Sequence, residues 1–119
     1  MNQKNNDSFL IICKELFMEG ITPLSKHRTE KYIQLVVIAK KYFLKDEYEG
    51  FAQFFQEGQY FIELWAAHLI LEYGSPNIDL ISRCIKVIKK YSNNPLAIVA
   101  AEEEKEWLND NKEKYKEYI

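Results

Sequence analysis

The two histidines are the side chains in this sequence best suited to metal or acid–base chemistry. His68 stands in a mostly apolar stretch four residues before Glu72, so a helix would place both side chains on one face. This spacing could hold a metal ion, but a core histidine hydrogen-bonded to its neighbour has the same pattern, and we favour that interpretation. Di-iron bundles require E-x-x-H pairs, and the residues at that offset are Leu24 and Trp65. We therefore expect no metal site, and we expect His27 to be solvated.

The recognised motifs of hydrolases, nucleotide-binding proteins and zinc proteases do not occur in the sequence. It contains no G-x-S-x-G, G-x-x-x-x-G-K-[ST], G-x-G-x-x-G or H-E-x-x-H, and its four glycines are scattered. Cys13 and Cys84 lie in apolar segments without a C-x-x-C pair, which predicts buried free thiols in a reducing compartment. We therefore predict a protein that is not an enzyme and has no cofactor.

Residues 46–72 have the most pronounced charge pattern in the chain. They include six acidic residues and no Lys or Arg, whereas residues 1–45 carry eight basic and four acidic residues. The acidic region is also rich in aromatic residues, most of which have the helical spacing of a core, while its tyrosines at helix starts could be exposed. An acidic face with tyrosines suits a basic protein partner, because charge guides the approach and tyrosine supplies contact area. The predicted protein-binding residues are Asp46, Glu47, Tyr48, Glu49, Glu57, Tyr60 and Glu63.

The same acidic region has a second interpretation, a solvated face whose charges pair internally with the neighbouring positive segments. Nucleic acid is an unfavoured partner, because 16 basic and 18 acidic residues give a net charge of −2, whereas dedicated nucleic-acid binders are usually basic. The main basic run has only Tyr91 nearby for base stacking, so we interpret it as the exposed side of an amphipathic helix. This run consists of Arg83, Lys86, Lys89 and Lys90.

Glycine and proline divide the chain into helix-sized segments, in which apolar residues recur at intervals of three and four. Each proline follows a favoured N-cap residue, and an acidic capping-box pair gives a fourth candidate start. The expected helix starts are Thr22-Pro23, Ser75-Pro76, Asn94-Pro95 and Asp46. We expect Gly20 and Gly74 to end helices in the left-handed conformation. The pattern predicts an all-α fold of about six helices in antiparallel hairpins, near residues 8–19, 26–44, 47–57, 59–73, 77–91 and 95–117.

Two of these segments differ from the others in hydrophobicity. Segment 59–73 is apolar on nearly all sides, which predicts a central helix covered by neighbours before and after it. The last segment is highly charged from Glu102 onward, so we expect it to lie along the surface and to fray past Asn109. The apolar runs elsewhere are about five residues long, against the ~20 needed for a membrane span, and no secretion signal is recognisable. We expect a soluble, cytoplasmic protein.

Residues 54–72 resemble a HEAT-like repeat, in which a short helix and a tight turn precede a second helix of the form V-R-x-x-A-A-x-x-L. Ile62 takes the first position, Ala66-Ala67 the small pair, and Leu69 or Ile70 the last position. A looser copy would comprise residues 77–91 and 95–108. The chain is similar to small bacterial HEAT-like helical-repeat domains of uncharacterised function, and it departs from their pattern at Glu63, where such repeats often carry Arg.

This resemblance implies a single domain over residues 1–119, stacked in a right-handed manner. Residues 1–44 would form N-terminal cap helices and residues 46–110 the repeats, because a repeat cannot cover its own apolar face alone. An irregular helical bundle is the alternative architecture.

With the acidic region, the resemblance predicts a non-enzymatic protein-interaction module. By analogy with the role of some HEAT-like domains, its concrete form is a bacterial immunity protein that binds a basic toxin. Two alternatives stay open. One is an enzyme or small-ligand binder with an inter-helix pocket near His68, and the other is a structural, homo-oligomeric helical protein.

Overall fold

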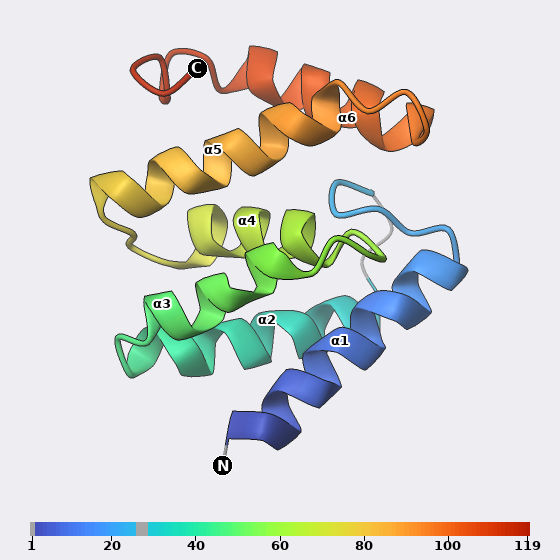
Figure 1. The fold of residues 1–119 in the computed structure, drawn as a ribbon, viewed down its shortest axis with the longest axis vertical. Coiled ribbons are helices and arrows are strands. Elements are labelled where there is room, and N and C mark those ends of the chain that lie inside the picture. Colours follow the sequence, from blue (N-terminus) through green and yellow to red (C-terminus); the bar gives the residue numbers. More distant parts are fainter. Residues whose placement is uncertain (1, 26–28) are drawn as a thin grey trace.

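Helices account for all the regular secondary structure in the part of the chain that the structure describes. The structure is a computed structural model that describes the backbone of residues 2–25 and 29–119 and the side chains of residues 8–25 and 29–119. Its elements are α1 (Asn2–Met18), α2 (Glu30–Leu44), α3 (Tyr48–Phe51), the 3-10 helix η1 (Ala52–Gln56), α4 (Ile62–Tyr73), α5 (Ile78–Ser92) and α6 (Ile98–Asp110) (Figure 1). The predicted all-α fold is confirmed.

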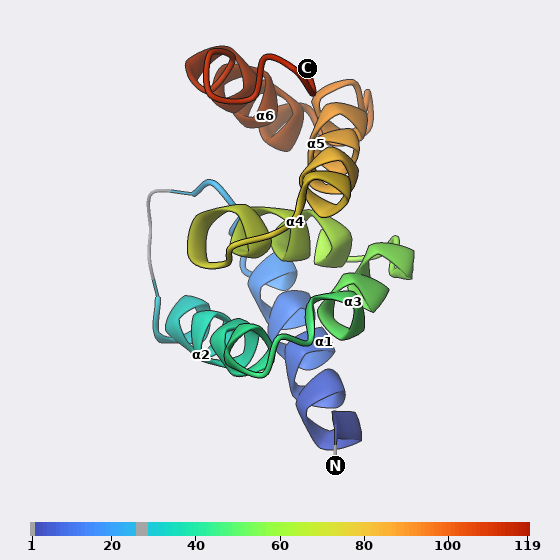
Figure 2. The ribbon, with the colours of Figure 1, turned by 90° about the vertical axis from the view of Figure 1, so that its left-hand side faces the viewer.

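Helix α4 is the centre of the molecule. It packs against α1, α2, η1 and α5, while α6 packs on α5. Figures 1 and 2 show α1 and α2 on one side of α4 and the α5–α6 pair on the other, with the N-terminus at the end remote from α6. Every residue from 62 to 70 is buried, as expected for a helix that is apolar on nearly all sides. The prediction of a central helix is therefore confirmed.

The proline-based helix starts are wrong, because local hydrogen bonds cap the helices or form turns at other residues. Helix α5 begins after Asn77, whose side-chain oxygen accepts the N–H of Leu80 at 2.8 Å, so Pro76 lies outside the helix. In the next connection, the side chain of Asn94 accepts the N–H of Leu96 at 2.9 Å and forms a turn, so α6 begins only at Ile98.

The first proline also precedes a turn and not a helix. The N–H of Ser25 donates to the carbonyl of Thr22 at 3.0 Å, which closes a turn around Pro23. Helix α2 instead begins after Thr29, whose hydroxyl oxygen accepts the N–H of Tyr32 at 3.3 Å. The sequence pattern located each segment but not the residue at which it starts.

Backbone angles account for two further differences, at Gly74 and Asp46. Gly20 has a φ of +77° and ends α1 as expected, whereas Gly74 is extended, with a φ of −105° and a ψ of −178°. Gly74 is needed for space, because a Cβ there would lie 2.9 Å from both a carbonyl oxygen of α4 and the ring of Tyr48. Asp46 has a left-handed φ of 56°, so it does not cap α3, which begins after Glu47 without a side-chain cap.

The bounds of three other segments also differ from the predicted ones. Helix α1 begins at Asn2 and not near residue 8, and the predicted helix 47–57 is divided into α3 and η1. Helix α6 ends at Asp110, close to the predicted fraying point, but the turns that follow are packed. Tyr115 is buried there and stacks on Trp107 with ring centroids 5.7 Å apart. The C-terminal segment therefore contributes to the core of the α6 layer.

Both cysteines are buried free thiols, as the sequence predicts. Burial raises the pKa of Cys84 to about 12 and raises that of Cys13 well above its usual value. These thiols are therefore unreactive packing residues in the folded protein.

No helix among the described residues combines the length and the apolar character that a bilayer crossing requires.

Candidate functional site

Six of the seven predicted protein-binding residues fall into two separate sites, and the first is a groove at the start of α3. We call it the acidic groove; it has a volume of about 460 Å³. Four predicted residues line it together, and none of its described lining residues is basic. The lining consists of Tyr42, Asp46, Glu47, Tyr48, Glu49, Gly50, Ser75, Asn77 and Leu80.

Tyr48 is held rigidly in the wall of the acidic groove. Its ring stacks on Phe43 with centroids 4.9 Å apart and planes 9° apart, and its hydroxyl oxygen accepts the N–H of Ser75 at 2.8 Å. The backbone of Gly74 packs against the same ring. Tyr48 thus joins the start of α3 to the α4–α5 connection, and its conformation is fixed before any partner arrives.

The three carboxylates of the acidic groove differ in their pairing. Glu49 accepts a hydrogen bond from Arg83, whose guanidinium also donates to Asp79 at 3.1 Å. Internal pairing, the second interpretation of the acidic region, therefore applies to Glu49. Within the described residues, Asp46 and Glu47 form no ion pair. Burial and the charge of Glu47 raise the pKa of Tyr42, so the phenol in this groove stays protonated.

Glu57, Tyr60 and Glu63 do not belong to the acidic groove. Glu57 is exposed in the connection between η1 and α4, and Tyr60 is half-buried. Glu63 lies in the first turn of α4, at the opposite end of that helix from Ser75, and is only 4% exposed. Glu63 was predicted to bind a partner together with the other acidic residues, and the structure instead buries it apart from them, because its helix is surrounded by packing partners. The apolar residues around it were the sequence feature that could have indicated its burial.

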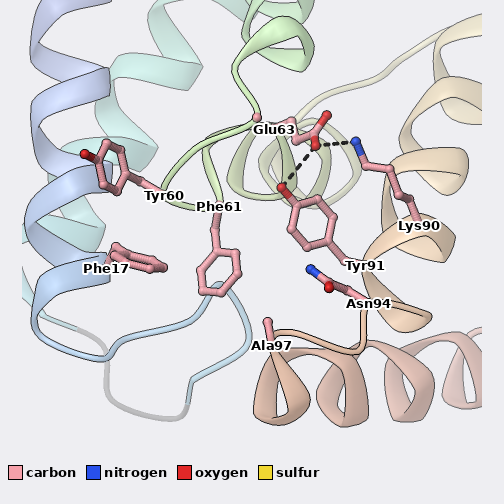
Figure 3. Close-up of a pocket in the computed structure, with 9 residues that line it drawn as sticks. Phe17, Tyr60, Phe61, Glu63, Lys90, Tyr91, Asn94 and Ala97 are labelled. Atoms are coloured by element: carbon pink, nitrogen blue, oxygen red, sulfur yellow. Dashed lines mark hydrogen bonds and ion pairs between the residues drawn. The ribbon is translucent and has the colours of Figure 1, made fainter.

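The second site is a pocket between the end of α1, the start of α4 and the end of α5, with a volume of about 570 Å³ (Figure 3). We call it the aromatic pocket. Two adjacent lining residues have left-handed backbone angles, Tyr60 with a φ of 54° and Phe61 with a φ of 58°. This pair explains why α4 begins at Ile62 and not near residue 59. The lining consists of Phe17, Gly58, Tyr60, Phe61, Glu63, Lys90, Tyr91, Asn94 and Ala97.

Glu63 provides the buried charge of the aromatic pocket. Its Oε1 accepts a hydrogen bond from the hydroxyl of Tyr91 at 3.0 Å and another from the ammonium of Lys90. Burial, together with the charge of Glu63, raises the pKa of Tyr91 well above its usual value, so the phenol remains a donor. Figure 3 shows Lys90 and Tyr91 reaching the same carboxylate from neighbouring positions on α5.

His68 is a core histidine, but its partner is not the expected Glu72. Its Nε2 lies 2.7 Å from Oε1 of Glu104, a residue of α6, and both side chains are buried. The ring of Trp107 meets His68 edge to face, with centroids 5.1 Å apart. Glu104 could not be identified from the sequence, because it stands in a charged segment and its partner lies 36 positions away.

The cavity beside His68 is small. It measures about 160 Å³, and its lining includes Glu72 and Tyr115. Among the described residues, no three His, Cys, Asp or Glu side chains are grouped as a metal site would require. His27, expected to be solvated, lies outside the described residues.

In comparisons with known proteins, no family model, no curated protein and no solved structure matches this chain.

Proposed function

We propose that this protein is a non-enzymatic interaction domain that binds a basic protein partner through the acidic groove. The observation that carries the proposal is the grouping of Asp46, Glu47 and Glu49 around Tyr48 in one concave surface. Opposite charge guides a partner toward such a surface and disfavours acidic competitors.

The pairing within the groove indicates where the partner would make contact. Arg83 already occupies the carboxylate of Glu49, so Asp46 and Glu47 are the groups that remain for a lysine or arginine of the partner. The ring of Tyr48 is already held in place by stacking on Phe43, so it loses little further conformational entropy when a partner binds. The groove thus combines two accessible charges with one rigid contact residue.

The finer form of the proposal follows the family resemblance. The sequential packing of α4 on η1, of α5 on α4 and of α6 on α5 suits a HEAT-like stack, with residues 1–44 as its cap. The partner would then be a basic toxin, and this chain a bacterial immunity protein acting in the cytoplasm. A small-ligand function near His68 has less support, because a cavity of about 160 Å³ is below the roughly 300 Å³ of ordinary ligand pockets.

The test is an NMR titration of the labelled protein with a hexalysine peptide at low salt. We expect the largest chemical-shift changes at residues 46–49 and 75–77, and we expect Glu47→Lys to weaken binding about tenfold. Glu57→Lys is the matched control, because it reverses an exposed acid outside the groove and should have a much smaller effect. The proposal is wrong if the peptide prefers the exposed acidic residues of α6, such as Glu102 and Glu106, or if both reversals weaken binding equally.

A further inference from the structure

We infer that the aromatic pocket binds an arginine side chain of a partner protein, and that Lys90 is an internal ligand that occupies the guanidinium position in the free protein. This is a second binding site, beyond the proposed function, because none of its lining residues belongs to the acidic groove. It assigns a ligand class to a pocket that is formed by three elements distant in sequence.

The first argument is the unused hydrogen-bonding capacity of a buried carboxylate. The side chain of Glu63 is 6% exposed, and both of its hydrogen bonds end on Oε1. Among the described residues, no donor reaches Oε2. A carboxylate can accept bonds at both oxygens, and a buried charge is stable only when it is well paired. Oε2 therefore offers a place for a cationic donor that enters the pocket.

The second argument is the row of aromatic rings beside this carboxylate. The ring of Phe61 meets Phe17 at a centroid distance of 5.3 Å and Tyr91 at 5.9 Å, and Phe17 also meets Tyr60 at 5.5 Å. Figure 3 shows these rings arranged from the end of α1 to the end of α5. Aromatic faces attract cations, and the planar guanidinium of arginine stacks on them more readily than a lysine ammonium does.

The backbone conformation supports a binding role for this row. Tyr60 and Phe61 are adjacent bulky residues with positive φ, an arrangement that L-residues with a Cβ adopt only at an energetic cost. Such strain is retained where the surrounding structure imposes it, and it is concentrated at binding sites. Here the strained pair ends the connection before α4 and supplies two of the rings that line the pocket.

Lys90 makes the contacts that a ligand cation would make. Its Nζ is bound to Oε1 of Glu63 and lies 5.5 Å from the centroid of the Tyr91 ring. The lysine side chain is nevertheless 61% exposed, so it can swing into solvent without disturbing the core. An arginine that replaces it would gain a second carboxylate oxygen through a bidentate contact and would stack on the rings. A ligand can therefore displace Lys90 from Glu63, and an arginine of the partner would bind this carboxylate more tightly than Lys90 does.

The rim of the pocket suits the residues that would flank this arginine. Ala97 lines the pocket, and the residues around it in the α5–α6 connection and the first turn of α6 are strongly exposed apolar side chains. Leu96 is 92% exposed, Ile98 70% and Val99 68%. Neighbouring exposed apolar residues of this kind mark contact surfaces. The expected ligand is thus an arginine within an apolar segment.

The experiment uses N-acetyl-arginine-N-methylamide as the probe, titrated into the full chain and followed by NMR shifts of residues 58–63 and 90–97. We expect Lys90→Ala to bind the probe about fivefold tighter than the natural protein, because Glu63 is then free. Lys90→Arg should bind it several-fold more weakly, because the new side chain fills the guanidinium position itself. Glu63→Gln should lose about tenfold in affinity, because the charge that pairs with the probe is gone.

The controls separate this site from simple charge attraction and from the acidic groove. The norleucine analogue of the probe has no charge and should bind at least several-fold more weakly. Glu47→Gln should leave unchanged the probe affinity that is measured from the shifts of residues 58–63 and 90–97, so a failure here is distinct from a failure of the proposed function. Lys90 is on the surface, so its variants remain informative even if Glu63→Gln does not fold. Equal affinity of Lys90→Ala and Lys90→Arg, or shifts centred on residues 46–49, would overturn the inference.

Discussion

Glu104 and Glu63 are both buried glutamates, but the partner of Glu104 is buried and the partner of Glu63 is exposed. Glu104 is 1% exposed and pairs at 2.7 Å with His68, which is itself buried under the ring of Trp107. Glu63 is 4% exposed and pairs with Lys90, whose side chain is mostly in solvent. The first carboxylate has a partner that cannot leave without unpacking the core, and the second has one that can.

This difference separates a structural contact from a binding contact. Helix α6 packs chiefly on α5, so the bond between Glu104 and His68 ties the outer layer of the molecule to the central helix. The bond between Glu63 and Lys90 instead lies in the wall of an open pocket. Burial of a carboxylate alone does not reveal its role; the exposure of its partner distinguishes the two contacts.

The largest expected effect tests the structural contact. Glu104→Ala removes the partner of His68 and leaves a buried imidazole nitrogen unpaired, so we expect a loss of about 3 kcal/mol in the free energy of unfolding. Glu104→Gln keeps an acceptor at nearly the same place and should lose about 1 kcal/mol. Urea unfolding followed by circular dichroism measures both. A loss below about 1 kcal/mol for the alanine variant would show that the pair does not hold α6 in place.

A smaller effect is expected at the second carboxylate. Glu63→Ala leaves Lys90 solvated and removes only the acceptor of the Tyr91 hydroxyl, so we expect a loss of about 1.5 kcal/mol. A double-mutant cycle sharpens the comparison. The coupling of Glu63 with Lys90 should be below about 1 kcal/mol, as for a pair with an exposed partner, and that of Glu104 with His68 should exceed it. Equal couplings would remove the distinction between the two contacts.

The fold was predictable from the sequence to the level of helical segments, because periodicity and the turn residues are local properties. Burial on all sides of α4 also followed from its composition. Helix starts were not predictable from proline alone, since Asn77 and Asn94 form competing hydrogen bonds that depend on the local chain path. The left-handed conformation of Tyr60 and Phe61 before α4 was not predictable either, because bulky residues such as these rarely adopt it.

The candidate sites were predictable only where their residues are neighbours in sequence. Asp46, Glu47, Tyr48 and Glu49 line one groove, as their adjacency suggested. Glu63 was assigned to the same face because charge was considered without burial. Its partner Lys90 lies 27 positions away, on a helix whose packing no local pattern specifies. The aromatic pocket therefore required the tertiary structure.

The smallest effect concerns alkaline pH and, of the two carboxylate contacts, involves only that of Glu63. Burial and the charge of Glu63 raise the pKa of Tyr91 in the folded protein, whereas in the unfolded chain this phenol ionises near pH 10. Above that pH the unfolded state releases the proton first, so Tyr91 lowers the stability as the pH rises, by about 1 kcal/mol near pH 10.5. The buried Cys13, Cys84 and Tyr42 and the half-buried Tyr73 add their own losses in the same direction, and these are common to all the variants below. Tyr91→Phe should lose this component. Glu63→Gln should lose part of it, because burial remains while the charge is removed, and Glu104→Gln should keep it, because its contact involves no phenol. Denaturant unfolding from pH 8 to 10.5 provides the measurement. If Tyr91→Phe follows the same pH dependence as the natural protein, the surroundings do not shift the pKa of this phenol, and if Glu63→Gln keeps the whole component, the phenol does not sense the carboxylate.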